Sequence, residues 1–303
     1  MPSWQNNPQR RAFVKACLVA ASVGATGAYA SPWSPRLQTS VQPVWKLTGH
    51  GGQLYLLAET PPRPSSWQDQ HIERLFDSCT SLWTETNQEY KEPQAKLIQR
   101  LAIDPKRPLS QWLDQEDKRR LAHAAAYCKV DVTDLEPYRP WCAVSVLQDA
   151  YYSASDATGK SADRVLRDRA TRNHRPTYSE FPTKDDVFEW FARMTRDQEL
   201  QFFRYTLDEI LAGPEAGSII YDAWQHGNLE PAAIEVARYT RAYPALAEIL
   251  TAQRNQRWMP RFSHMLETPG TAFVVVGLYH IVGPQGLLAL AKQHGITVTK
   301  TTG

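Results

Sequence analysis

Cysteine is scarce in this sequence, with four residues among 303. Only Cys79, Cys128 and Cys142 lie after residue 30, and an odd number of cysteines excludes a framework in which all are paired. Cys128 and Cys142 bracket a short segment, so an oxidising compartment would allow one bridge between them. The alternative is that each thiol is a small apolar side chain in the core. The sequence leaves both alternatives open.

Blocks of one charge sign are also absent. The chain carries 34 basic and 32 acidic residues, a formal net charge of +2. Three of the basic residues and none of the acidic ones precede Ser31, so the chain from Ser31 onward has 31 basic and 32 acidic residues, a net charge of −1. Nucleic-acid binding usually needs Lys and Arg clustered on one face. The sequence therefore predicts no nucleic-acid partner.

Apolar runs long enough to cross a bilayer are missing as well. The apolar stretch near the N-terminus is too short to do so. A basic front, RRAFVK (residues 10–15), precedes an apolar stretch over residues 16–29, whereas a membrane span takes about 20 residues. AYA, residues 28–30, is a small-x-small cleavage site. This order predicts a signal peptide over residues 1–30. The mature protein is then periplasmic or secreted, without stable membrane insertion after cleavage.

The basic front favours one of two export routes. RRAFVK resembles the twin-arginine signal, which exports folded proteins, although Gln9 stands where Ser or Thr usually precedes the arginine pair. General secretion is the alternative. Residues 31–43, rich in Pro, Ser and Gln, are predicted to be a flexible lead-in, and residues 44–303 a single domain.

The start of that domain has the pattern of a β-α-β unit. VWKLTGHGGQLYLLAET, residues 44–60, contains two apolar runs around a glycine-rich turn at residues 49–52, because glycines accept the positive φ angles of tight turns. Residues 67–79 place apolar side chains at helical spacing, and SLWTET, residues 81–86, has the pattern of a strand.

The end of the chain repeats this plan. TAFVVVG, residues 271–277, is predicted to be a buried strand, residues 284–295 a helix, and ITVTK, residues 296–300, a last strand. The two ends predict an α/β (α+β) fold in which two-lobed, pseudo-symmetric β-α-β units form a mixed sheet. The middle is predicted to be a mostly helical insertion, with Ser110 and Thr183 as helix caps.

Polar side chains stand at the ends of three apolar strands. Glu85 lies near the end of SLWTET, Glu180 near the end of RPTYSEF (residues 175–181), and His280 follows TAFVVVG. If these strands are parallel neighbours, all three side chains meet in one crevice. A histidine with two carboxylates could bind a divalent metal or act in acid–base catalysis. The alternatives are solvated glutamates and an ordinary hydrogen-bonded loop histidine.

The last part of the chain resembles the TraB/GumN family in two segments, AQRNQRWMPRF and GTAFVVVGLYHIVGPQGLLALAKQHGITVTK. This family groups with Tiki-type metalloproteases and with haem-uptake and erythromycin-esterase-like proteins. The family's hallmark is two Gly-x-x-His motifs at strand ends, and GLYH, residues 277–280, matches the second. SLWTET is similar to the strand that carries the family's glutamate, and residues 162–181 resemble its central helix and strand. The matching positions are Glu85, Asp163, Glu180, Arg254, Asn255, Gly277, His280 and Gly283.

The resemblance implies an exported, metal-dependent, peptidase-like hydrolase. His280 and Glu85 would hold a divalent ion such as Mn²⁺, Co²⁺ or Zn²⁺, which lowers the pKa of its bound water. Glu180 or Glu85 would be the general base, with Arg254 as a further catalytic residue. The ligand would be a peptide or a small molecule.

The first Gly-x-x-His motif is replaced in this chain. Its four positions hold Ala58, Glu59, Thr60 and Pro61, and proline offers neither a metal-binding lone pair nor a titrating group. On an extended strand Glu59 shares a face with Pro61, so it could replace the histidine as a ligand. Otherwise metal binding is weak or absent, since few ligands remain. The sequence thus predicts a family member with a degenerate metal site that binds rather than cuts. The alternative is an active hydrolase that uses Glu59.

Overall fold

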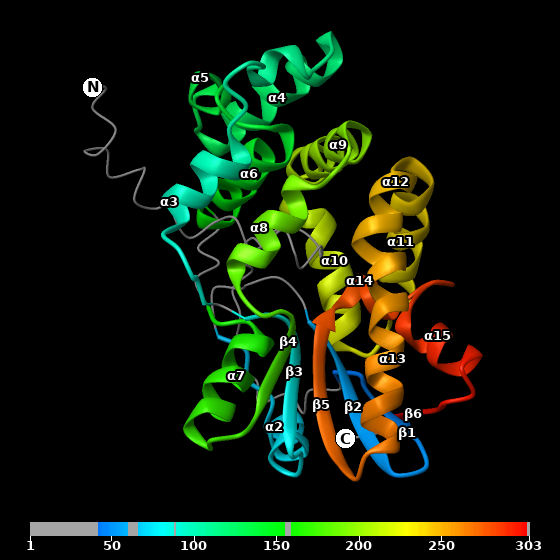
Figure 1. Cartoon of the computed structure of the whole chain (residues 1–303). Coiled ribbons are helices and arrows are strands. Elements are labelled where there is room, and N and C mark those ends of the chain that lie inside the picture. The colour runs from blue at the N-terminus through cyan, green and yellow to red at the C-terminus, as the bar shows by residue number, and fades with distance from the viewer. Residues whose placement is uncertain (1–41, 60–65, 88, 155–158, 302–303) are drawn as a thin grey trace.

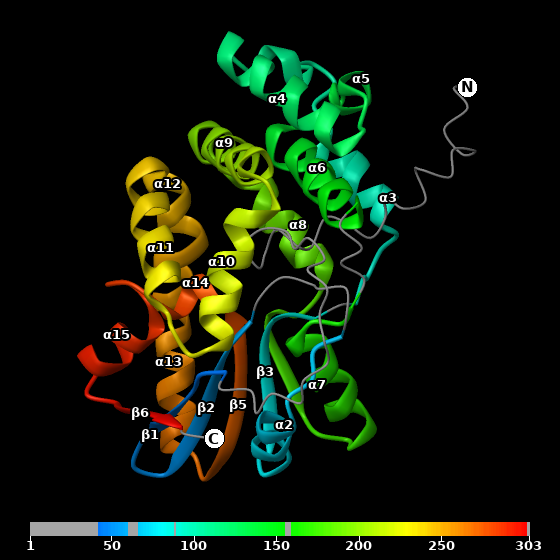
Figure 2. The ribbon, with the colours of Figure 1, turned by 180° about the vertical axis from the view of Figure 1, so that it is seen from behind.

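Figure 1 and Figure 2 show the computed structural model from opposite sides, and the structure describes residues 42–59, 66–87, 89–154 and 159–301. The predicted signal peptide and most of the lead-in lie outside the described residues, as do Thr60 and Pro61 of the replaced motif. Within the described ranges, no helix is both long enough and apolar enough to cross a membrane.

In the described part of the chain, six strands form one mixed sheet in the order β4-β3-β5-β2-β1-β6. β2, β5, β3 and β4 are mutually parallel, and β1 is antiparallel to both of its neighbours. The predicted α/β fold with a mixed sheet is confirmed. The bounds of the strands are β1 (Val44–Thr48), β2 (Gly52–Glu59), β3 (Ser81–Thr86), β4 (Thr177–Phe181), β5 (Gly270–Gly277) and β6 (Thr297–Thr301).

The two predicted β-α-β units share this sheet by interleaving. β5, from the end of the chain, lies between β2 and β3 from its beginning, and β6 lies against β1. β5 is buried from Ala272 to Gly277, as expected for a parallel strand that is covered on both faces. The apolar run that predicted this strand is therefore explained by its central place in the sheet.

Helices pack on the sheet, and many others gather beyond the carboxyl ends of the parallel strands (Figure 1). The predicted helical insertion thus forms a layer over the edge where the strand ends meet. The bounds of the helices are α2 (Gln70–Asp77), α3 (Gln94–Leu97), α4 (Gln115–Cys128), α5 (Val132–Leu135), α6 (Pro140–Ala154), α7 (Ala162–Arg172), α8 (Lys184–Ala192), α9 (Arg196–Ala212), α10 (Pro214–Gln225), α11 (Glu230–Ala242), α12 (Pro244–Ala247), α13 (Gln253–Glu267), α14 (Leu278–Ile281) and α15 (Leu287–Gln293).

The two faces of the sheet are covered by different helices. Trp83 of β3 packs on Trp258 of α13, with ring centres 5.1 Å apart. The next residue, Thr84, accepts a hydrogen bond from Arg167 of α7 at 2.8 Å. Because consecutive side chains point to opposite faces of a sheet, α13 and α7 lie on opposite sides. α2 is joined to α7 by ion pairs, and α15 packs against α13.

The helices that connect successive strands therefore change from one face of the sheet to the other at the middle of the sheet. The connection from β2 to β3 carries α2 on the α7 face, whereas the connection from β5 to β6 carries α15 on the α13 side. In doubly wound sheets, ligands bind outside the carboxyl ends of the strands at such a switch point. The ends of β2, β5 and β3 are therefore the place to look for a site.

Of the two helix caps that the sequence predicted, the structure contains one. Thr183 forms the predicted capping box at the start of α8, and α9 ends at Gly213, whose φ is +76°. The predicted cap at Ser110 is wrong. That residue lies in a separate 3₁₀ turn, Leu109–Gln111, and α4 is capped by Asp114. Both residue types cap helices well, so the sequence alone did not separate them.

Residues 244–267 form a helix that is continuous but not uniform. α12 passes into α13 through a π-helical segment, Glu248–Ala252. Arg254 and Asn255 follow this segment directly, and both side chains are fully buried. π-helical segments are rare and often accompany functional sites.

The glycine-rich turn at residues 49–52 packs against the end of α13. A Cβ atom at Gly51 would lie 2.3 Å from the carbonyl oxygen of Glu267, and one at Gly49 would lie 2.6 Å from Leu266. The turn does not use the positive φ angles that the sequence suggested. Its glycines allow a close approach between backbones, which is a different use of the same residue.

The three cysteines after residue 30 are all buried and free. Cys128 and Cys142 therefore do not form the bridge that the sequence left open. Burial raises the pKa of the Cys79 and Cys128 thiols to about 12. The thiols act as small apolar side chains of the core, which is the second of the two alternatives.

Candidate functional site

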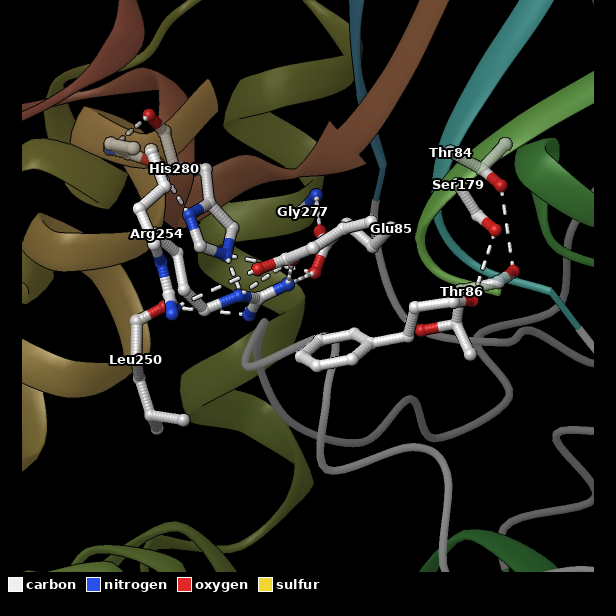
Figure 3. Close-up of polar contacts among 12 residues, drawn as sticks. Thr84, Glu85, Thr86, Ser179, Leu250, Arg254, Gly277 and His280 are labelled. Carbon is white, nitrogen blue, oxygen red and sulfur yellow. Dashed lines mark hydrogen bonds and ion pairs between the residues drawn. The ribbon is translucent and has the colours of Figure 1, made fainter. Parts of the chain in front are cut away.

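Glu85 and Glu180 lie side by side near the carboxyl ends of β3 and β4. The register pairs Thr84 with Ser179, so the residues that follow, Glu85 and Glu180, stand opposite each other. Figure 3 shows Glu85 directed toward Arg254 and Thr84 directed away from it. Like charges directly opposite each other on neighbouring strands repel. The pair therefore needs a cation nearby.

Arg254, from the first turn of α13, supplies that cation. Its Nε and Nη2 donate to Oε2 of Glu180 at 2.9 and 2.6 Å, and Nη2 also donates to Oε2 of Glu85 at 2.6 Å. The guanidinium is fully buried and lies 5.0 Å from the centre of the Trp258 ring. Buried charges are tolerated when they are paired and hydrogen-bonded in this way.

His280 lies beside the same guanidinium and is oriented by Asn255. Nδ2 of Asn255 donates to the carbonyl oxygens of His280 and Gln285 at 3.0 and 2.7 Å, which directs its Oδ1 toward Nδ1 of His280, 2.7 Å away. Nδ1 therefore carries the proton. Nε2 presents its lone pair to Nη1 of Arg254, 3.2 Å away (Figure 3).

The backbone at the end of β5 completes the cluster. N of Gly277 donates to Oε1 of Glu85 at 2.6 Å, so the GLYH segment is tied to β3. Gly283 has a φ of +85° where the chain turns between α14 and α15, a conformation that favours glycine. These two motif glycines therefore contribute through the backbone, and they position His280 rather than act on a ligand.

Burial and Arg254 set the protonation of the cluster. Burial raises the pKa of Glu85, while the charge of Arg254 and the N–H of Gly277 oppose that rise. Burial also lowers the pKa of His280 well below its ordinary value, and the charge of Arg254 lowers it further. Burial alone would lower the pKa of Arg254, but Glu180 and Glu85 hold it above its ordinary value. At neutral pH the imidazole is neutral and the guanidinium is charged.

Glu59 is not part of this cluster. It ends β2 in register with Gly277, and side-chain alternation places it on the α7 face. Its Oε1 accepts a hydrogen bond from N of Asp163 at 3.1 Å. Burial, and then the charge of Asp163, raises the pKa of Glu59 well above its ordinary value. The predicted ligand set of His280, Glu85 and Glu59 is therefore not assembled, because its third member faces the other side of the sheet.

Asp163 belongs to a second polar cluster, at the start of α7. Its Oδ1 accepts from the hydroxyl of Ser161 at 2.6 Å, and its Oδ2 pairs with Arg167 at 3.1 Å. Arg167 also donates to the hydroxyl of Thr84 and to the carbonyl oxygen of Thr86. The predicted motif residue Asp163 thus helps to hold α7 on β3.

Sequence reasoning missed two residues of these clusters, Arg167 and Trp258. Arg167 follows Asp163 by four residues, and Trp258 follows Arg254 by four residues. Residues at this spacing are neighbours on a helix surface. The spacing was therefore a signal that could have identified both.

The donors present at the strand ends do not fit a metal ion. In the ranges that the structure describes, no group of three or more His, Cys, Asp and Glu side chains is arranged to hold one. The lone pair of His280 faces Arg254, and Oε2 of Glu85 accepts from the same guanidinium. A metal would have to displace a buried arginine. The catalytic and metal-binding roles suggested for Glu85, Glu180, Arg254 and His280 stay predictions.

The fold and the site together define a doubly wound α/β protein with a charged cluster at the carboxyl ends of its central strands. Residues 43–300 match the model of the TraB/PrgY/gumN family, and the chain belongs to this family. The resemblance inferred from the GLYH motif and from the Arg254-Asn255 pair is thereby confirmed. No curated protein sequence matches the chain.

Proposed function

We propose that this protein is an exported member of the family that binds a ligand at the strand-end cluster without metal-dependent cleavage. The contact between Arg254 and His280 carries the proposal, because the guanidinium takes the nitrogen lone pair that a metal would need. Export to the periplasm or beyond rests on the sequence of residues 1–30, which has the order of a signal peptide.

The energetics of the cluster support binding over metal chemistry. Arg254 neutralises Glu85 and Glu180 at once, and removal of one partner from a buried charge network costs about 3–5 kcal/mol. A divalent ion would have to offset that cost with the donors that remain. Glu59, the proposed replacement for the lost histidine, lies on the other face of the sheet. This position argues against the alternative of an active hydrolase that uses Glu59.

Glu180 marks the more open side of the cluster. Its side chain is 13% exposed, and Arg257, 57% exposed, lies 3.9 Å from its Oε1. A peptide or small molecule that approaches from solvent would meet this carboxylate and guanidinium first, and the buried Arg254 would hold them in place. Ionic groups of the ligand are therefore the groups we expect the site to recognise.

The proposal is tested by adding Zn²⁺, Co²⁺ and Mn²⁺ to the purified protein while the imidazole nitrogens of His280 are followed by ¹⁵N NMR. We expect the signals of a neutral ring protonated at Nδ1, unchanged by the metals, and no stoichiometric heat of binding in calorimetry. His50→Gln, at an exposed turn, is the matched control for nonspecific coordination. Tight binding of one ion, lost in both His280→Gln and Glu85→Gln, would instead support the metal-dependent hydrolase.

A further inference from the structure

Two arginine side chains lie against one indole ring in the helical part of the molecule, outside the strand-end cluster. Cζ of Arg107 is 5.0 Å from the centre of the Trp112 ring, and Cζ of Arg196 is 5.8 Å from the same centre. Arg196 is the first residue of α9, and Trp112 follows the 3₁₀ turn Leu109–Gln111. Both arginine side chains are exposed. Cation–π contacts with a shared ring thus hold two positive charges close together at the surface.

No carboxylate neutralises these two charges. Among the described residues, neither guanidinium takes part in an ion pair. The acidic residues closest to them along the chain have other partners. Asp104 accepts a hydrogen bond from N of Lys106 at 3.1 Å, and Asp197 accepts one from Nε2 of Gln201 at 2.9 Å. Like charges held near each other repel, so an anion that contacts both guanidiniums would be stabilised here.

The indole adds a donor that has no acceptor. Nε1 of Trp112 is buried, and within the described ranges it has no hydrogen-bond partner. An indole nitrogen can only donate, and buried donors are nearly always paired in proteins. Because the two guanidiniums lie over this ring on long, exposed side chains, they can shift to contact a ligand and admit one of its oxygens to Nε1. The site therefore offers two cationic forks and one neutral donor.

We propose that Arg107, Trp112 and Arg196 bind the phosphate group of inorganic phosphate or of a phosphomonoester. The planar guanidinium matches phosphate oxygens in a bidentate geometry. A phosphomonoester carries a charge of about −1.5 to −2 at neutral pH, which balances two arginines. A carboxylate would leave one of them without a counter-ion, and a metal cation would be repelled. The inference goes beyond the function proposed for the strand-end cluster and does not depend on it.

Calorimetric titration of the full chain with inorganic phosphate at pH 7.5 tests the proposal. We expect one saturable site whose affinity falls when sodium chloride is raised from about 0.05 M to about 0.5 M, because salt screens exposed charges. Dimethyl phosphate, which carries a single charge, should bind at least about tenfold more weakly. Methyl phosphate separates the two sources of the group: tighter binding than inorganic phosphate assigns the site to a phosphomonoester, and weaker binding assigns it to the free ion.

Three substitutions and a matched control assign the binding to these side chains. Arg107→Gln and Arg196→Gln should each weaken phosphate binding at least about tenfold, and Trp112→Phe, which keeps a ring but loses the N–H, about three- to tenfold. Arg193→Gln should leave the affinity unchanged, because that guanidinium is 79% exposed and already pairs with Glu189 at 3.4 Å.

Four results would each overturn the proposal. They are no saturable binding of phosphate, equal binding of dimethyl phosphate, an equal loss of affinity in Arg193→Gln, and an unchanged affinity in Arg107→Gln or Arg196→Gln. Thermal unfolding of each variant shows whether it is folded. If Trp112→Phe does not fold, the two arginine variants decide, since their side chains are exposed.

Discussion

Nη1 of Arg254 lies 3.2 Å from Nε2 of His280, and this single contact determines what the strand-end histidine can do. Asn255 fixes the proton on the other ring nitrogen. The free lone pair is then used inside the protein, on a guanidinium that is itself shared between two carboxylates. The arrangement makes the stability of the cluster depend on Arg254 more than on any other side chain in it.

Arg254→Met is expected to lower the free energy of unfolding by about 3–5 kcal/mol, because it leaves Glu85 and Glu180 buried without their cation. Urea denaturation of the two proteins measures the difference. Arg257→Met is the matched control: that guanidinium is 57% exposed and 3.9 Å from Glu180, so its loss should cost no more than about 1 kcal/mol. Similar losses for the two variants would show that the buried network is not what stabilises this edge of the sheet.

Glu85→Gln should have opposite consequences in two backgrounds. In the wild type it removes a charge that is paired with Arg254 and should destabilise the protein. In Arg254→Met it removes an unpaired buried charge and should restore part of the lost stability. The double-mutant cycle is expected to give a coupling energy of about 1–3 kcal/mol. Additive effects in denaturation experiments would contradict the direct pairing of the two residues.

The stability that His280 contributes should fall in mild acid. Its pKa in the folded protein is well below the value of 6.5 that applies to the unfolded chain, so the unfolded state takes up a proton first as the pH drops. The contribution is therefore complete above about pH 6.5 and is lost below it, by up to about 1.4 kcal/mol per pH unit. The stability difference between wild type and His280→Gln should shrink between pH 7.5 and pH 5. A difference between wild type and His280→Gln that stays constant over this range would contradict the prediction.

Gly51→Ala should destabilise the protein by about 1–3 kcal/mol, because the added Cβ would lie 2.3 Å from the carbonyl oxygen of Glu267 and the end of α13 would have to move. Thermal unfolding measures the loss. His50→Ala, in the same turn but with an exposed side chain, should have a much smaller effect. An unchanged melting temperature in Gly51→Ala would mean that the turn and α13 do not pack as closely as described.

Much of the candidate site could be predicted from local sequence. Apolar runs show where a strand stops, and Glu85, Glu180 and His280 follow or end such runs. The structure brings these three together with the Arg254-Asn255 pair. The capping box at Thr183 was equally local, since its donor and acceptor lie within one helical turn. The strand ends and the capping box depend on residues that are close in the chain, whereas the contacts of Arg254 with Glu85 and Glu180 join residues that are far apart in it.

The position of Glu59 could not be predicted in the same way. Side chains along a β-strand alternate between the two faces of the sheet, so residues two apart share a face. This alternation does not show which of the two faces they share. That choice follows from the pairing of β2 with β5, which come from opposite ends of the chain. The register sets Glu59 on the α7 side, whereas Glu85 points toward α13. A one-residue shift in that pairing would reverse the result.

The sequence by itself determined the family, the mixed α/β fold and the strand-end positions of the polar side chains, because apolar periodicity and short motifs are properties of neighbouring residues. Only the tertiary structure decided which of these side chains meet. Arg254 lies far along the chain from Glu85 and Glu180, and their contact requires α13 to pack on the face to which both glutamates point. Packing of distant elements, and not local pattern, therefore paired His280 with a guanidinium.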